Sequence, residues 1–395
     1  MNCSQRLRTE RGAILIQAAI AGFVLIGLTG FVVDYGIFWL AREQTQQAAD
    51  AAAMAGALAR AYGDPDPDAP VAPIVGLQAE ASVGMNPVWF DADAGKPVVS
   101  FDCPPELVAI RCVRVDVFRD GTSGSAAIPT LLAPLFGITS QGVRATATAR
   151  VAIGNSTPCL KPWAIPDNWF EGSVPPNPSF VRYVEPGGGE TVPFPDAYTA
   201  PTEEYAGSGM TLSDDLGRML ILSDKTNPEG SAPIDNRFLL PLVLEGPNTY
   251  AENIAGCNGR LARFGQFVPT GTAAMATETA AAVNALIALD PSASWNFATK
   301  TVQNSCAPEC APVSPRLVAL AVFDVDLYQL MRATNNWCPG GQRCVRVVNI
   351  AGFFVQMVIG NGIVGYVARY PGIISADYPS VISTASFLPT VTLVR

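Results

Sequence analysis

Histidine is absent from this chain of 395 residues. Because histidine is the side chain used most often as a general base near neutral pH, its absence excludes Ser-His-Asp and Cys-His catalysis and every histidine-containing zinc site. Carboxylates, lysine or tyrosine can still support catalysis, so an enzyme becomes less favoured without being excluded. The chain also lacks a phosphate-binding loop, a dinucleotide-binding glycine motif and a nucleophile elbow. We therefore expect a non-enzymatic protein with no cofactor and no catalytic residue.

A basic surface is also missing. The formal net charge is −9 and the pI is about 4.7, and the only basic cluster lies near the N-terminus, at Arg6, Arg8 and Arg11. Nucleic-acid binding needs cations that neutralise phosphates, so nucleic acid is not an expected partner. Hydrophobic residues make up 49% of the chain, which is enough to fill the cores of one large or two medium domains.

One long apolar segment dominates the N-terminal region. From Ala13 to Val33 the only strongly polar side chain is Gln17. At about 1.5 Å per residue, a helix of this length crosses a hydrocarbon core of about 30 Å. Positive charge precedes the segment and Asp34 follows it, so the positive-inside rule predicts that residues 1–12 are cytoplasmic and that the rest of the chain lies outside. A cleavable signal is the competing interpretation, but the segment is too long and no small-x-small site follows it.

The helix is expected to continue beyond the membrane through residues 34–62. Apolar and small residues recur there every three or four positions, at Ile37, Leu40, Gln44, Ala48, Ala51, Ala55, Leu58 and Tyr62. This face would allow close approach of another helix or of an exterior domain. Within the membrane, Ala18, Gly22 and Gly30 lie on one face, a pattern that can drive helix association and homo-oligomerisation but is also common by chance.

Eight of the nine cysteines follow the apolar segment, and only Cys3 precedes it. Two tight C-x2-C pairs are absent, which argues against a four-thiolate metal site and favours disulfides in an oxidising compartment. The spacing suggests Cys103 with Cys112, Cys306 with Cys310 and Cys338 with Cys344, and elimination leaves Cys159 with Cys257. Eight cysteines permit about 105 pairings, so this pairing is a hypothesis.

The fold class predicted for the exterior is α+β, with a mixed or antiparallel sheet. A helix is expected near residues 74–83, strands at 98–101 and 113–117, a helix at 127–136 and a strand at 143–153. Later strands at 317–325, 345–350 with 353–359, and 363–369 would complete this sheet. On this interpretation residues 73–154 and 313–395 form one composite domain, and the proline-rich and aromatic residues 155–312 form a loop-rich insertion with a buried strand at 238–244 and a helix at 272–289. A separate second domain is the alternative.

Three groups of carboxylates could suggest chemistry, and each has a plainer explanation. Asp64, Asp66 and Asp68 alternate with prolines and do not match a calcium loop, so a helix stop is favoured. The sequence at residues 120–125 matches only part of a metal-adhesion loop and is better explained as a glycine-rich turn. Asp324 and Asp326 could act as an acid/base pair, but the end of a strand entering solvent is the preferred interpretation. No metal site is expected.

The aromatic residues from Trp163 to Tyr183 suggest a second class of function. Their interleaving with prolines could form a groove for glycan or peptide, which would make the protein a membrane-tethered binding protein. The favoured explanation is a loop layer sealed onto the sheet by its aromatic side chains.

The ordered motifs of the anchor resemble those of TadE/TadG-like Flp pilus-assembly proteins. The resemblance rests on Arg11-Gly12-Ala13, the apolar run to Val33-Asp34-Tyr35-Gly36, and the segment from Gln47 through Asp50 to Ala57. The strand at residues 143–149 and the segments 162–166 and 348–354 are also similar to that group. In pilin-like relatives a peptidase cuts after the glycine of a motif with glutamate at the fifth mature position, where this chain has Gln17. The protein therefore resembles TadG-like members retained in the membrane more than processed TadE-like ones.

This resemblance implies a single-pass protein of the bacterial inner membrane with a periplasmic body. Its expected partners are the lipid bilayer and other pilus-assembly or pilin-like proteins, through docking with pilus subunits or with the secretion channel. The motif residues expected to matter most are Arg11, Gly12, Gln17, Asp34 and Asp50. We expect Asp34 to set the outer depth of the span, because a carboxylate at the membrane centre is costly.

Overall fold

The computed structural model describes residues 3–62, 73–89, 96–101, 111–122, 124–167, 169–170, 197–198, 215–224, 238–271, 273–338, 341–360, 362–375 and 387–394. The chain forms two compact units. The first comprises Met1–Arg60, Val71–Val151 and Val391–Arg395, and the second comprises Ala61–Pro70 and Ala152–Thr390. Both units combine sheets with helices, which confirms the α+β class.

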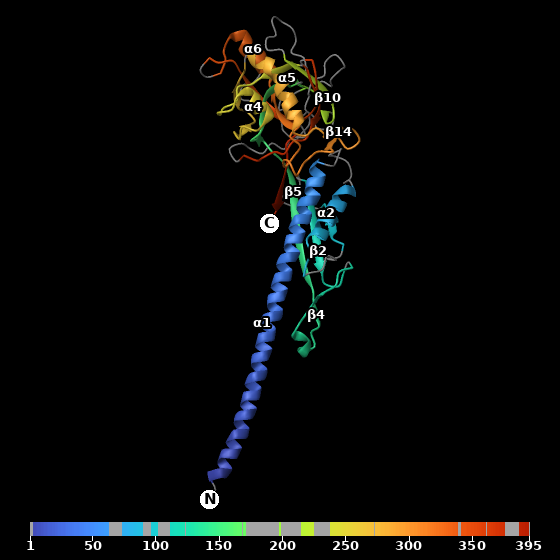
Figure 1. Cartoon of the computed structure of the whole chain (residues 1–395), viewed down its shortest axis with the longest axis vertical. Helices are drawn as coiled ribbons and strands as arrows, with labels where there is room; N and C mark the ends of the chain where they lie inside the picture. The colour runs from blue at the N-terminus through green and yellow to red at the C-terminus, as the bar shows by residue number, and fades with distance from the viewer. Residues whose placement is uncertain are drawn as a thin grey trace. The chain divides into compact units, whose positions relative to one another are not determined.

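Helix α1 runs without interruption from Cys3 to Tyr62, over 60 residues (Figure 1). No proline interrupts it, because the first proline of the chain is Pro65. Among the described helices it is the one that is long and apolar enough to cross a membrane. Large apolar side chains are exposed on all sides of its first half, from Ile14 to Val33. A helix that is apolar all round is suited to a lipid environment.

The first unit is built on an antiparallel sheet that packs against the second half of α1. Its strands are β1 (Val98–Ser100), β2 (Arg111–Arg119), β5 (Val143–Ile153) and β19 (Pro389–Val394), in the order β1-β2-β5-β19. Val113, Val115 and Val117 of β2 lie opposite Ala149, Ala147 and Ala145 of β5. These side chains share one face of the sheet, and all six are buried against α1 and the short helix α2 (Pro73–Met85).

Alanine forms the contact face of α1, but in a different register from the predicted one. The fully buried positions include six alanines, Ala41, Ala48, Ala49, Ala52, Ala53 and Ala57, together with Thr45. Leu40 and Leu58, which were expected on this face, are exposed. The small face lets the helix approach the sheet so closely that a Cβ at Gly56 would lie 2.9 Å from Cγ1 of Val113. Alanine on both α1 and β5 explains this approach, because larger leucines would hold the helix away.

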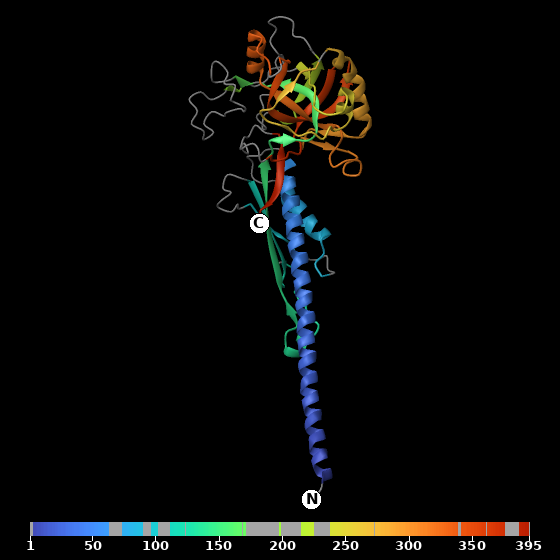
Figure 2. The same cartoon turned by 90° about the vertical axis from the view of Figure 1, so that its left-hand side faces the viewer.

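The segment predicted as a helix at residues 127–136 is instead a β-hairpin with a short 3-10 helix at its tip. Its strands are β3 (Ile128–Pro129) and β4 (Ser140–Gln141), and the 3-10 helix is η2 (Ala133–Phe136). The prediction was wrong because Pro129 and Pro134 both interrupt the pattern of helical N–H donors. Figures 1 and 2 show this hairpin beside α1, further toward the helix N-terminus than the rest of the first unit.

The second unit contains a seven-stranded sheet in the order β13-β17-β16-β7-β11-β10-β18. Its strands are β7 (Leu160–Pro166), β10 (Met219–Asp224), β11 (Phe238–Pro241), β13 (Phe267–Pro269), β16 (Leu317–Phe323), β17 (Cys344–Ile359) and β18 (Gly362–Ala368). The long strand β17 pairs with β16 on one side and with β18 on the other, so six of the strands close into a ring. A Cβ at Gly352 or Gly365 would collide with backbone of the neighbouring strand, which explains glycine at both positions.

Both faces of this sheet are buried. Alternate residues of β16 point to different cores: Val318, Leu320 and Val322 pack with α4 (Tyr250–Ala255) and α5 (Ala273–Ala288), whereas Ala319, Ala321 and Phe323 pack on the other side with α6 (Val325–Thr334). This double burial explains the continuous apolar run of β16 in the sequence. The remaining strand pairs are β6 (Ser156–Thr157) with β12 (Ala262–Arg263), β8 (Trp169–Phe170) with β9 (Ala197–Tyr198), and β14 (Ser294–Asn296) with β15 (Thr301–Gln303).

Strand pairing differs from the composite domain predicted from the sequence. The late strands β16, β17 and β18 pair with β7, β13 and β10, which lie within the predicted insertion 155–312, and β11 of the same insertion joins this sheet between β7 and β10. Of the late strands only β19 joins the sheet of the first unit. The late strands were located correctly, but apolar strands of similar pattern carry no signal for their partners. The late strands β16, β17 and β18 therefore lie in the second compact unit, in one sheet with strands of the predicted insertion.

Three predicted disulfides are present in the second unit, joining Cys159 to Cys257, Cys306 to Cys310 and Cys338 to Cys344. Cys112 is also disulfide-bonded, and Cys103, its predicted partner, lies outside the described residues. Beside the first bridge, the buried Lys161 Nζ donates a hydrogen bond of 2.6 Å to the carbonyl oxygen of Gly256. A disulfide directly before β7 and a hydrogen bond from β7 thus both connect this strand to the segment that follows α4.

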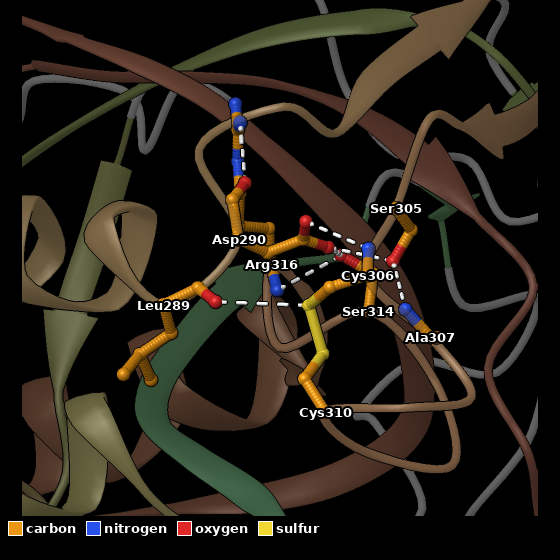
Figure 3. The surroundings of a disulfide bond; sticks show 8 residues. All are labelled: Leu289, Asp290, Ser305, Cys306, Ala307, Cys310, Ser314 and Arg316. Atoms are coloured by element: carbon orange, nitrogen blue, oxygen red, sulfur yellow. Dashed lines mark hydrogen bonds between the residues drawn. A yellow bond between two sulfur atoms is a disulfide. The ribbon is translucent and has the colours of Figure 1, made fainter.

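A buried ionic cluster organises the loop around the Cys306–Cys310 bridge (Figure 3). The Asp290 carboxylate accepts hydrogen bonds from the hydroxyls of Ser305 and Ser314, both 2.6 Å long, and from the backbone N–H of Cys306. Burial opposes ionisation, but these donors hold the pKa of Asp290 below its usual value. Arg316 donates to the backbone carbonyls of Asp290, Ala293, Val355 and Gln356, so its charge also has partners. The cluster is a structural support for this loop.

Candidate functional site: the junction of the apolar helix and the hairpin

Asp34 connects the apolar helix to the hairpin. Its carboxylate accepts hydrogen bonds from three consecutive backbone N–H groups, with shortest distances of 2.8 Å from Leu131, 3.1 Å from Leu132 and 2.6 Å from Ala133. Leu132 is the N-cap residue of η2, and its own side chain makes no capping hydrogen bond. Asp34 therefore caps the N-terminal end of η2 from another part of the chain, where a carboxylate is stabilised by unpaired N–H donors.

This contact changes the role that the sequence suggested for Asp34. The expectation was a carboxylate held at the membrane interface by its need for water. In the structure Asp34 is only 5% exposed, because it lies on the same face of α1 as the buried Ala41 and Ala48. Backbone donors of the hairpin replace water as partners of the charge.

Two glycines of α1 make room for the hairpin. A Cβ at Gly30 would lie 2.9 Å from the Cβ of Leu132, and one at Gly27 would lie 3.7 Å from the ring of Phe136. The hairpin thus covers α1 from Gly27 to Asp34. Between the two elements lies a mostly apolar crevice of about 630 Å³, and its lining includes Phe31, Phe38 and Ile138.

The tip of the hairpin, residues 130–139, has acceptors for seven of its backbone N–H groups, and it carries exposed apolar side chains. Apart from the three N–H groups bound by Asp34, the N–H groups of Thr130, Leu135, Gly137 and Ile138 donate to carbonyls within the tip. Pro134 has no N–H to satisfy. The side chains of Leu131, Leu135, Phe136 and Ile138 are each more than half exposed.

The other motif residues lie along α1 and are not brought together at this junction. Residues 11 and 12 belong to α1, but the side chain of Arg11 lies outside what the structure describes. Gln17 is exposed on the apolar half of the helix. Asp50 is half-buried, and its carboxylate accepts a hydrogen bond of 2.8 Å from Gln46. Arg11, Gly12, Gln17 and Asp50 keep their proposed importance as predictions.

The residues proposed for helix association separate into two groups. Gly30 is buried beneath Leu132 within the same chain. Ala18 is exposed, and a Cβ at Gly22 would meet no atom within 4 Å. Ala18 and Gly22 thus remain accessible to a second helix, whereas Gly30 already has an intramolecular partner.

The acidic sequences considered earlier have structural roles where the structure describes them. Asp324 is the N-cap of α6 and accepts a hydrogen bond of 2.8 Å from the N–H of Leu327. Asp120 accepts hydrogen bonds from the backbone and hydroxyl of Thr122, in a turn where Gly121 and Gly124 have positive φ. Asp64, Asp66 and Asp68 lie outside the described residues.

Trp163, the first residue of the suggested aromatic groove, belongs to a core. It is fully buried, and its indole N–H donates to the hydroxyl of Tyr250 over 3.0 Å. It is therefore unavailable to a glycan or peptide. The side chains of the other aromatic residues in this segment, from Trp169 to Tyr183, lie outside the described part of the chain.

Within the described ranges, no group of three Cys, Asp or Glu side chains is placed to hold a metal ion. The absence of a metal and of a cofactor remains a prediction from the sequence.

The junction with the hairpin was missed by the sequence analysis. Its one sequence signal is the lack of charge: residues 121–143 contain no Asp, Glu, Lys or Arg. Such a stretch with exposed leucine and phenylalanine is unusual for a surface loop. Nothing in the local sequence, however, indicates that its acceptor is Asp34, which lies 97 residues earlier than Leu131.

Comparison with known families matches this part of the chain. Residues 12–60 match the model of the Flp pilus-assembly TadE/G-like family, and residues 39–149 match that of the Tad-like Flp pilus-assembly family. The resemblance to Flp pilus-assembly proteins is confirmed. The matches support a pilus-assembly role and do not distinguish TadE-like from TadG-like members. No curated protein and no solved structure matches the chain.

Asp34 and the hairpin both fall within the residues that match these pilus-assembly families. Together with the apolar helix, the matches support a membrane-anchored protein. The junction therefore lies within the part of the chain that matches the pilus-assembly families.

Proposed function

We propose that this protein is a non-enzymatic, membrane-anchored component of Flp pilus assembly or tight-adherence secretion. Its N-terminus lies in the cytoplasm, α1 crosses the bacterial inner membrane, and the parts of both units that follow Asp34 lie in the periplasm. There they dock with pilus subunits or with the secretion channel. Retention of the anchor, as in TadG-like proteins, is part of this proposal.

The observation that carries the proposal is the continuity of α1. One helix provides both the apolar segment of residues 13–33 and the alanine face that forms part of the core of the first unit. A helix that is shared in this way transmits position and force from the membrane to the folded unit without a flexible linker. This property suits a protein that must hold a partner at a fixed distance from the membrane.

The orientation is supported by charge and by the disulfides. Arginines precede the apolar segment, and the disulfide-bonded cysteines all follow it. Disulfides persist in oxidising compartments such as the periplasm and are rare in the cytosol.

Deletion of the encoding gene and counting of surface pili by electron microscopy tests the proposed role. We expect loss of pili and of surface adherence, with both restored by the wild-type gene. Unchanged piliation in the deletion strain would contradict a role in assembly.

Docking is tested by photocrosslinking in intact cells. A photoreactive amino acid at Met219 or Ile359, which are exposed on β10 and β17, is expected to form adducts with a pilus subunit or a channel component. The buried Leu222 of β10 is the matched control position. Normal piliation with no adduct to any pilus-assembly protein from the exposed positions would count against docking through this face.

A further inference from the structure

We propose that the hairpin tip, residues 130–139, is a second membrane-inserting element that lies in the outer leaflet beside α1. This proposal depends on α1 crossing the bilayer and is independent of the role in pilus assembly. Four observations on the first unit support it: position, surface chemistry, backbone hydrogen bonding and the crevice beside α1.

The position of the hairpin follows from its contacts with α1. Phe136 faces Gly27, which precedes Asp34 by seven positions and lies well inside the apolar segment 13–33. Seven residues of α-helix correspond to about 10 Å along the axis. If the tip lay in water, only residues 13–26 would remain for the bilayer, and they extend about 21 Å, well short of a hydrocarbon core of about 30 Å.

The surface of the tip suits lipid. Leu131, Leu135, Phe136 and Ile138 are 53% to 73% exposed. No charged residue occurs anywhere between Asp120 and Arg144, so insertion of the tip would not bury an ionised side chain of its own. Just beyond Asp34, the exposed Tyr35 and Trp39 of α1 are residue types that concentrate at the membrane–water interface.

A loop can insert into hydrocarbon only when its backbone groups have hydrogen-bond partners, because an unsatisfied N–H there costs several kcal/mol. Most loops do not meet this condition. Here seven of the nine N–H groups of the tip have acceptors within the chain, and the Asp34 carboxylate is the acceptor for three of the seven. The carboxylate thus performs a task that water performs at an ordinary surface loop. Its own charge is compensated by the same three donors.

The crevice between α1 and the hairpin agrees with this assignment. Its lining combines Gly27, Gly30 and Phe31 of the helix with Leu132, Phe136 and Ile138 of the hairpin. Acyl chains are the occupant that continuity with the lipid-facing surface of α1 indicates.

The test uses the full-length protein in vesicles of phosphatidylethanolamine and phosphatidylglycerol. A benzophenone amino acid is placed at Leu135, with Phe23 of the apolar segment as the positive control and Leu77 of α2 as the negative control. All three positions are exposed and apolar, and all belong to the first unit. We expect lipid adducts at Leu135 at a yield near that at Phe23 and several-fold above that at Leu77.

A yield at Leu135 equal to that at Leu77, with strong labelling at Phe23, would overturn the proposal while leaving the anchor intact. Weak labelling at Phe23 as well would instead contradict the membrane span on which the proposal rests. A second measurement avoids any substitution: wild-type protein is irradiated with a phospholipid that carries a diazirine in its acyl chain. Labels are expected in the peptide with residues 131–138 as well as in 14–33, and labels confined to 14–33 would refute insertion of the hairpin.

Discussion

At the scale of single residues, the two carboxylates that matter most in the described structure both cap helices. Asp34 caps η2 from a distant part of the chain, and Asp324 caps α6 from the position directly before it. The sequence placed Asp324 at the end of a strand, but the expectation that it enters solvent was wrong, because Asp324 is 3% exposed and caps the helix that follows. The first role depends on a contact between residues about a hundred positions apart, which no local pattern encodes.

Replacing Asp34 with leucine should release the hairpin from α1. The amides of Leu131, Leu132 and Ala133 lose their acceptor, so we expect their hydrogen exchange to accelerate by roughly tenfold or more. Hydrogen exchange of the full-length protein in detergent micelles, read by mass spectrometry, measures this. Asp50→Asn is the control, because Asp50 is a half-buried carboxylate of the same helix. It accepts a hydrogen bond from Gln46, so its loss should leave exchange in the hairpin unchanged. Equal exchange in the wild type and the Asp34→Leu variant would contradict the assigned contact.

Asp324 should make stability depend on pH. Burial raises the pKa of Asp324 from 3.8 to about 6. Because the folded-state pKa is the higher one, the contribution of Asp324 to stability is fully present below about pH 3.8 and is lost as the pH rises through about 6. Asparagine is an equally good N-cap and cannot ionise. The Asp324→Asn variant should therefore be more stable than the wild type at pH 7, by on the order of 2 kcal/mol.

Denaturant unfolding of both proteins between pH 4 and pH 7 measures this difference. The two free energies of unfolding should converge toward pH 4 and separate toward pH 7. Curves that stay parallel over this range would show that Asp324 does not titrate as described.

At the scale of elements, α1 is the feature that the sequence predicted best and the hairpin is the one that it missed. The span and its continuation followed from an apolar run and a small-residue period, both of which are local. The register of the buried face was displaced by about one position, because alanine and leucine both satisfy an apolar pattern while only alanine fits the close approach to β2 and β5. Strand partners in the second unit could not be predicted, since β16 and β17 are apolar on both faces.

A substitution on the alanine face of α1 should lower stability more than a substitution at an exposed position of the same helix. Ala52 is fully buried against the sheet, so Ala52→Leu overpacks the core and is expected to lower the free energy of unfolding by about 1–3 kcal/mol. Leu58→Ala, at an exposed position on the same helix, should change it by no more than about 0.5 kcal/mol. Guanidinium unfolding in detergent micelles gives both values. A larger effect at Leu58 than at Ala52 would support the face predicted from the sequence instead of the observed one.

At the scale of the whole molecule, two units are carried by one chain, and the second unit depends on cross-links that differ greatly in span. The Cys159–Cys257 bridge joins residues 98 positions apart, whereas the Cys306–Cys310 bridge closes a loop of only 4. Spacing and elimination suggested four pairs, and the structure confirms three of them, while Cys103 with Cys112 stays a prediction. The sequence did not indicate which strands and loops these bridges connect.

Loss of the long bridge should be more damaging than loss of the short one. A cross-link stabilises by restricting the unfolded chain, so the Cys159→Ala/Cys257→Ala variant should lose about 4 kcal/mol, against roughly 2 kcal/mol for Cys306→Ala/Cys310→Ala. Thermal unfolding of the two variants compares them directly. Equal losses would indicate that the bridges act through native packing instead of through the unfolded state.

The central claim is that α1 crosses the inner membrane once and that the parts of both units that follow Asp34 lie on its outer side. The most direct measurement is proteinase K digestion of spheroplasts that contain full-length protein with an N-terminal epitope tag. We predict that the second unit and the part of the first unit beyond Asp34 are degraded and that a tagged fragment containing residues 13–33 survives until detergent is added. Loss of the tag without detergent, or recovery of the full-length chain in the soluble fraction, would contradict the claim.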